Sequence, residues 1–113
     1  MLEQRIQQHF FDSADLKYQS AETVARPIAE AAAALLSAIT GGGKVMACGS
    51  GAGTVLARHL ARLFTGRFER ERPPLAALAL AGESAMQVQQ IRALGLPGDV
   101  LMYVDDGEGH STA

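Results

Sequence analysis

The feature that most constrains the fold of this chain is a short apolar run that passes through closely spaced glycines into an amphipathic segment. The run Lys44–Cys48 has glycines on both sides, which predicts a buried parallel strand. Residues Thr54–Phe64 follow and predict a helix. The apolar residues expected on the inner side of that helix are Val55, Leu56, Leu60, Leu63 and Phe64. A buried strand that leads directly into a helix is typical of α/β proteins.

The residues that join this strand to this helix are the candidate ligand site. Glycine lets the backbone turn sharply and approach a ligand closely, and the first N–H groups of a helix lack helical partners and attract anions. Ser50 and Thr54 add two hydroxyl groups. The residues expected to bind an anionic ligand are Gly49, Ser50, Gly51, Ala52, Gly53 and Thr54. A tight turn without a ligand is the structural alternative.

Two helices are predicted before this strand. Apolar residues at three- and four-residue spacing predict the first helix over Leu2–Leu16, and Ser20 is a suitable N-cap for a second helix that stops at Gly41–Gly43. Pro27 should kink this second helix or mark its restart.

A second strand–helix–strand unit is predicted after the glycine-rich junction. Strands are expected at Leu75–Leu80 and Asp99–Val104, with a helix at Ser84–Leu94 between them. This order predicts a three-layer αβα fold with a short parallel sheet. We expect one domain over residues 1–113, with amino-terminal helices at 1–40, a βαβαβ core at 44–104 and a polar tail at 105–113.

The whole-chain properties exclude several classes of protein. A chain of 113 residues buries a modest share of its surface, so an oligomer is expected. A net charge of −2 argues against nucleic-acid binding, and a single cysteine favours a reducing compartment. The apolar run Ala31–Ile39 is too short to cross a bilayer and no signal-peptide pattern is seen, so a cytoplasmic protein outside the membrane is expected.

Four stretches of the chain resemble one known family. They are Glu3–Ser13, Gly43–Gly49, Gly66–Leu80 with its Arg-Phe-Glu-Arg-Glu-Arg-Pro sequence, and Val88–Leu101 with its Pro-Gly-Asp-Val-Leu sequence. On these residues the chain resembles the SIS (sugar isomerase) domains of the phosphoheptose isomerase and DiaA (DnaA initiator-associating protein) family. The resemblance implies a flavodoxin- or Rossmann-like sheet, a phosphorylated sugar as ligand, and a homo-oligomer with the amino-terminal helices in its contacts. DiaA-like members further imply DnaA as a partner in replication initiation.

The resemblance also places changes at the family's functional positions. Ser50 replaces an Asn, and Gly53 replaces a phosphate-binding Ser for which Thr54 could partly substitute. His59 keeps the place of a metal-binding His, but Leu63 replaces the Glu that acts at the metal and in proton transfer. No catalytic residue is therefore assigned, and of the zinc site that the family implies only His59 remains as a candidate ligand.

The family's second phosphate loop corresponds to Asp105–Ser111 in this chain. Three acids in this segment would repel a phosphate, namely Asp105, Asp106 and Glu108. The family segment between Leu80 and Val88 is largely missing, and the family's carboxyl-terminal half has no counterpart. The resemblance therefore predicts a shortened, non-catalytic sugar-phosphate-binding protein that acts through oligomeric contacts, with a DiaA-like regulatory role as its sharpest version.

Two alternatives stay open. The first is an active sedoheptulose 7-phosphate isomerase with a rebuilt site. The second is a methyltransferase-like domain that binds S-adenosylmethionine, although such enzymes usually carry an acid where Ala47 or Cys48 stands here. Cys48 itself is expected to be an inert core thiol. The segment Arg67–Arg72 is either a subunit contact or a solvated loop, and the acids of the tail are a polar segment rather than a cation site.

Overall fold

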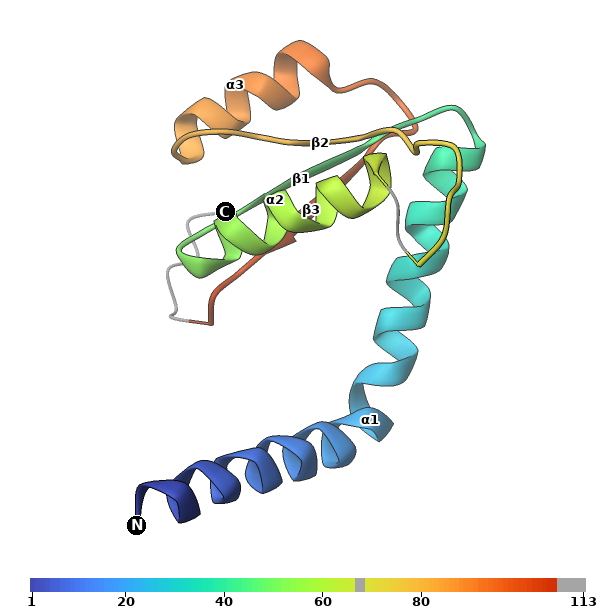
Figure 1. Ribbon diagram of the computed structural model, residues 1–113. Coiled ribbons are helices and arrows are strands. Elements are labelled where there is room, and N and C mark those ends of the chain that lie inside the picture. The colour runs from blue at the N-terminus through green and yellow to red at the C-terminus, as the bar shows by residue number, and fades with distance from the viewer. Residues whose placement is uncertain (67–68, 108–113) are drawn as a thin grey trace. The chain divides into compact units, whose positions relative to one another are not determined.

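The computed structural model describes residues 1–66 and 69–107, and the chain divides into two compact units, Met1–Ala33 and Ala34–Ala113. The element order is α1, β1, α2, β2, α3 and β3 (Figure 1). The first unit holds most of α1, and the second holds the end of α1 and the whole sheet. The candidate loop therefore belongs to the second unit.

Helix α1 spans Leu2–Thr40 as one element, so the prediction of two separate helices is wrong. Pro27 lies inside it, and the hydrogen bond that proline cannot donate would go to the carbonyl of Thr23. Both residues are exposed, so water can satisfy that carbonyl. The alanine-rich residues 29–34 follow at once and have high helix propensity. The helix therefore continues through the proline.

Among the residues that the structure describes, α1 is the one helix whose length and composition would allow it to cross a membrane. This is weak evidence, because helices of soluble proteins can meet the same criterion. Arg26 and Glu30 lie in the more apolar half of α1, and charged side chains are costly inside a bilayer. A location outside the membrane stays a prediction.

The sheet contains three parallel strands in the order β2-β1-β3. Strand β1 (Val45–Gly49) is central and pairs with β2 (Ala77–Ala79) and β3 (Val100–Val104). Every residue of β1 is buried, which confirms the prediction of a buried parallel strand. Strand β2 is shorter than the predicted Leu75–Leu80, because the Leu75 N–H donates to the carbonyl oxygen of Phe64 instead of to a strand.

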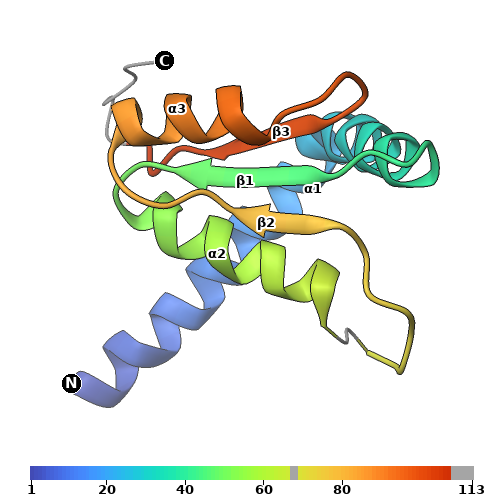
Figure 2. The same cartoon turned by 90° about the horizontal axis from the view of Figure 1, so that it is seen from above.

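Helices α2 (Ala52–Thr65) and α3 (Ser84–Leu94) cover opposite faces of the sheet (Figure 2). The residues that pack together on the α3 face are Met46, Cys48, Leu78, Leu80 and Ile91. Those on the α2 face are Ala47, Ala57, Ala61, Ala79, Met102 and Val104. The predicted three-layer αβα architecture is confirmed.

Helix α2 buries small residues against the sheet, whereas the large apolar residues expected on its inner side are half-buried at Leu60, Leu63 and Phe64 and exposed at the other two positions. Its buried residues are Gly53, Ala57 and Ala61, at four-residue spacing. Val55 and Leu56 are 65% and 53% exposed instead. The helix approaches β3 so closely that a Cβ atom on Gly53 would overlap the carbonyl oxygen of Val104. Small side chains are what this close approach requires.

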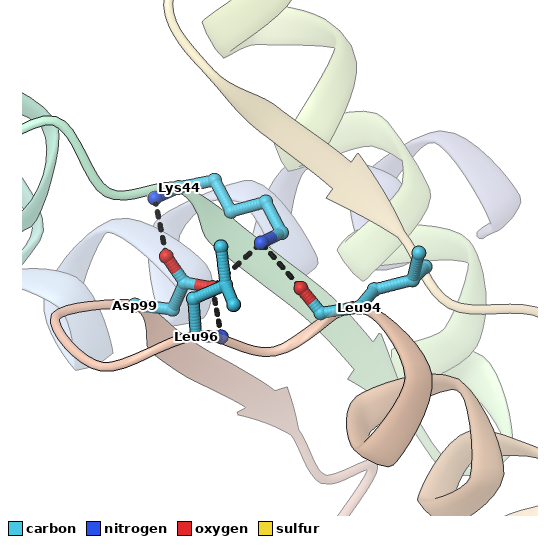
Figure 3. A network of polar contacts seen from close by, with 4 residues as sticks. All are labelled: Lys44, Leu94, Leu96 and Asp99. Carbon is cyan, nitrogen blue, oxygen red and sulfur yellow. Dashed lines mark hydrogen bonds and ion pairs between the residues drawn. The ribbon is translucent and has the colours of Figure 1, made fainter.

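Lys44 and Asp99 join the amino-terminal ends of β1 and β3 (Figure 3). The Lys44 Nζ atom lies 2.6 Å from Asp99 Oδ2 and 2.5 Å from the carbonyl oxygen of Leu94. The Asp99 carboxylate also accepts the backbone N–H groups of Lys44 at 2.9 Å and Leu96 at 2.8 Å. These hydrogen bonds, led by the one from the Lys44 side chain, lower the pKa of Asp99 from 3.8 to about 2. The fold therefore favours the charged form of the Asp99 carboxylate.

Asp99→Asn is expected to lower the urea midpoint of unfolding near pH 7 and to lose this effect as the pH falls from about 4 to about 2. The pKa of Asp99 is lower in the folded chain than in the unfolded chain. The carboxylate therefore stabilises the fold above its unfolded pKa, and protonation removes that stabilisation as the pH falls through its folded pKa. Urea unfolding followed by circular dichroism across this pH range measures the effect. A Glu69→Gln control should follow the wild type, and an Asp99→Asn deficit that persists unchanged to pH 2 would contradict the prediction.

The carboxyl-terminal end of α2 is capped by Arg72. Its guanidinium donates from Nη1 to the carbonyl oxygen of Phe64 at 3.1 Å and from Nη2 to that of Leu63. The last carbonyls of a helix have no helical partners, and a positive charge there interacts favourably with the helix dipole. Arg72 thus has a structural role within the chain, and the first two residues of the predicted segment Arg67–Arg72 lie outside the described residues.

Arg72→Ala should reduce the free energy of unfolding by about 1–2 kcal/mol, because two backbone carbonyls lose a charged donor. Chemical unfolding of the purified chain measures this loss. The matched control is Arg92→Ala, which removes an exposed arginine from the last turn of α3 and should change the free energy by less than about 0.5 kcal/mol. Equal losses in the two variants would show that Arg72 does not act as a cap.

Candidate functional site

The glycine loop, defined as Gly49–Thr54, begins at the carboxyl end of β1. The strand order β2-β1-β3 reverses its direction of growth between β1 and β3, and open α/β sheets bind ligands at such a switch point. The backbone N–H of Ser50 donates to the carbonyl oxygen of Val104 in β3 at 3.1 Å. The structure therefore brings the predicted site residues together and places them beside the segment that follows β3.

The glycines of this loop are required by the backbone itself. Gly51 has a φ of 53°, a conformation that residues with a side chain rarely adopt. A Cβ atom on Gly49 or on Gly53 would collide with the carbonyl oxygen of Val104. The glycine pattern is thus explained by local geometry, and a ligand has to be argued from other observations.

Several donors of the glycine loop are engaged within it. The N–H of Gly53 donates to the carbonyl oxygen of Ser50 at 2.8 Å, and that of Thr54 donates to Gly51 at 3.1 Å. The Thr54 hydroxyl, which was expected to be available for a ligand, donates to the carbonyl oxygen of Gly49 at 3.2 Å. A ligand that uses Thr54 would have to compete with this internal hydrogen bond.

Two acidic residues after β3 lie against the glycine loop. Asp105 Oδ1 accepts the Ser50 hydroxyl at 3.4 Å and the Gly107 N–H at 3.3 Å. The carboxylate of Asp106 fills the position that a Cβ atom on Gly51 would occupy. The third predicted acid, Glu108, and the rest of the predicted tail from residue 108 to 113 lie outside the described residues.

Gln87 is a contact of the loop that the sequence patterns did not single out. This buried residue of α3 donates from Nε2 to the carbonyl oxygen of Gly82 at 3.1 Å and to that of Gly49 at 3.4 Å. One signal for it was present: Gln87 shares a helical face with Ser84 and Ile91, at spacings of three and four residues. A polar residue on an apolar helix face indicates a buried hydrogen bond.

A cavity of about 290 Å³ adjoins Gln87 between α3 and the strands. Its lining residues are Cys48, Ser84, Gln87, Val88, Ile91, Leu101 and Tyr103. Burial raises the pKa of the Cys48 thiol, so this group is a protonated core thiol, as expected. The cavity supplies an apolar wall with a few polar groups, which is the usual character of a small-molecule site.

His59 lies exposed on α2, beside a shallow hollow. Arg62 and Leu63 also line this hollow; the arginine repels a divalent cation, and the leucine one turn after His59 has no donor atom. Among residues 1–66 and 69–107, no three His, Cys, Asp or Glu side chains are grouped so that they could hold a metal ion. The residues present do not fit the zinc ion that the resemblance implies.

A family model described as the SIS domain matches residues 9–113. The phosphoheptose isomerase of Methylibium petroleiphilum is 54% identical to this chain, over 92% of the chain and 58% of the relative. That of Aromatoleum aromaticum is 41% identical, over 88% of the chain and 57% of the relative. The chain thus spans less than two thirds of the length of these curated relatives.

Two solved structures have the same fold. The phosphoheptose isomerase of Francisella tularensis superposes with a TM-score of 0.77 at 34% identity, over 91% of this chain and 61% of that one. The enzyme of Neisseria gonorrhoeae superposes with a TM-score of 0.75 at 30% identity, over 91% and 60%. From its sequence match and its fold, this chain belongs to the SIS domain family, and the four relatives described above are phosphoheptose isomerases.

Proposed function

We propose that this chain is a sugar-phosphate-binding SIS domain of the phosphoheptose isomerase type and that it does not catalyse the isomerisation by itself. The observation that carries the proposal is the position of the glycine loop at the switch point between β1 and β3. The apolar cavity next to Gln87, a residue that donates a hydrogen bond to Gly49 of the loop, adds a wall for a sugar. The names of the relatives support a phosphorylated sugar as the ligand.

The expected lack of catalysis follows from the side chains that are present. Isomerisation of a sugar phosphate moves a proton between adjacent carbons, which needs a base within hydrogen-bond reach of the substrate. Leu63 offers no base one turn after His59, and Arg58 and Arg62 are the charged residues beside that histidine. Family membership does not favour the methyltransferase alternative, and the rebuilt isomerase is the outcome that an assay of turnover would detect.

Calorimetric titration with sedoheptulose 7-phosphate tests the binding. We expect weak heat with the wild type and none with Gly51→Val, because a branched side chain there would meet the Asp106 carboxylate and would strain the backbone. Gly42→Val is the matched control, since Gly42 also has a positive φ, of 90°, but has open space around it. A parallel assay should show no conversion of the sugar phosphate. If the wild type gives no heat of binding, the proposed sugar-phosphate binding is wrong. If the wild type converts the sugar phosphate and Thr54→Val does not, the chain is a catalyst and that part of the proposal is wrong.

The proposal includes a homo-oligomer, either a dimer or a tetramer, formed through the first unit of the chain. Large apolar side chains of that unit are exposed, namely Leu2, Ile6, Phe10, Phe11, Leu16 and Tyr18. Leu2, Ile6, Phe10 and Leu16 lie along one side of the helix, and an exposed apolar stripe of this kind marks an interaction site. Analytical ultracentrifugation at micromolar concentration should show an oligomer, and a chain that stays monomeric would contradict this part of the proposal.

The proposal also includes DnaA as a partner and a cytoplasmic location, both of which are implied by the family resemblance. Both curated relatives are named phosphoheptose isomerase, which supports sugar-phosphate binding more than a role in replication. Co-purification of tagged chain with purified DnaA tests the regulatory role separately from sugar binding.

A further inference from the structure

The carboxylate of Asp106 lies directly on the amino-terminal end of α2. A Cβ atom on Gly51 would overlap Asp106 Oδ2 and would lie 2.8 Å from Asp106 Cγ. Gly51 immediately precedes Ala52, the first residue of α2. A carboxylate of the chain itself therefore occupies the position at the amino-terminal end of α2 where a phosphate would bind.

The neighbouring Asp105 is tied to the same loop. Its Oδ1 atom accepts the Ser50 hydroxyl at 3.4 Å, and the Ser50 N–H donates to the carbonyl oxygen of the preceding Val104 at 3.1 Å. The segment that carries both aspartates is thus bonded to the loop by a side chain and by the backbone. Two negative charges are held where a phosphate dianion would approach, and charges of like sign a few ångströms apart repel each other.

We propose that Asp106, held in place with Asp105, is a built-in competitor for the anion site of the glycine loop. The loop accepts an external phosphate group only when the Asp106 carboxylate moves away from Gly51. This inference rests on the proposed function, because it names how the proposed sugar-phosphate site is controlled. This competition is the physical reason why the wild type is expected to bind a phosphate group only weakly.

The test compares variants of the full chain in which one carboxylate is replaced by an uncharged side chain. Calorimetric titrations with sedoheptulose 7-phosphate and with inorganic phosphate are made on the wild type and on Asp106→Asn, which keeps the size of the side chain. Asp106→Asn should bind both probes about tenfold more tightly, since one repelling charge is removed. Glu69→Gln removes an exposed carboxylate that lies beyond the carboxyl-terminal end of α2, and its affinity should equal that of the wild type.

The outcomes separate this inference from the function on which it rests. Equal binding by the wild type and Asp106→Asn would overturn the competition and leave the sugar-phosphate site standing, with Asp106 then acting only as a cap of α2. No binding by any variant would overturn both. Equal tightening by Glu69→Gln would assign the effect to net charge and would also overturn the competition. If Asp106→Asn fails to fold by circular dichroism, Asp106→Ser and Asp105→Asn make the same comparison.

Discussion

Gly53→Ala is expected to destabilise the fold by about 3 kcal/mol, although the same change usually stabilises a helix by about 1 kcal/mol. The added Cβ atom would overlap the carbonyl oxygen of Val104 in β3, with the Val104 carbonyl carbon at 2.7 Å. Backbone atoms of a central layer cannot turn aside as a flexible side chain can. Helix α2 must therefore move away from the sheet, which opens the packing of Ala57 against Ala47.

Chemical unfolding of Gly53→Ala beside Gly41→Ala measures this effect. Gly41 follows the end of α1, and a Cβ atom there would meet only the carbonyl oxygens of Ser37 at 3.2 Å and Ala38 at 3.7 Å. We expect Gly41→Ala to change the free energy of unfolding by less than about 1 kcal/mol. If Gly53→Ala is as stable as the wild type, α2 does not lie as close to β3 as described.

Met46→Ala is expected to cost about 2–5 kcal/mol, because it empties the core between β1 and α3. Met46 is 3% exposed and packs with Cys48 and Leu80. Its Cε atom lies 3.4 Å from the place of a Cβ on Gly95, so the side chain reaches to the end of α3. Deleting it removes these contacts from two layers at once.

The matched control is Met86→Ala, which makes the same substitution on the same face of the fold at a side chain that is 57% exposed. Its expected change in the free energy of unfolding is less than about 0.5 kcal/mol. Urea unfolding of the two variants compares a buried with an exposed methionine directly. Similar losses would show that the α3 layer is not packed on the sheet as described.

The fold could be predicted from the sequence where one local pattern decides the structure. The apolar run before Gly49 fixes β1, because a strand buried on both faces needs apolar residues throughout. The helix Ser84–Leu94 was predicted with the bounds that it has. Ser20 misled the prediction of α1, because a residue that is a good N-cap can also lie inside a helix. The proline penalty of about 3 kcal/mol at Pro27 is offset by the rest of this long helix.

The candidate site could be predicted only in part. The glycine loop follows from residues that are adjacent in the sequence, and its place beside Asp105 and Asp106 followed from the family resemblance. The inner face of α2 depends instead on how near the sheet lies, which hydrophobicity does not encode. The Gln87 contact joins residues 38 positions apart, so only the folded arrangement of α3 over β1 reveals it.

The burial of Cys48 has a practical consequence for handling the protein. It is the single cysteine of the chain, and its sulfur lies in the core under α3. Two folded chains cannot bring these sulfurs within bonding distance, because a disulfide needs Cα atoms less than about 7 Å apart. Covalent dimers that form during storage in air would therefore report molecules that have opened, and their fraction on a non-reducing gel becomes a simple record of unfolding.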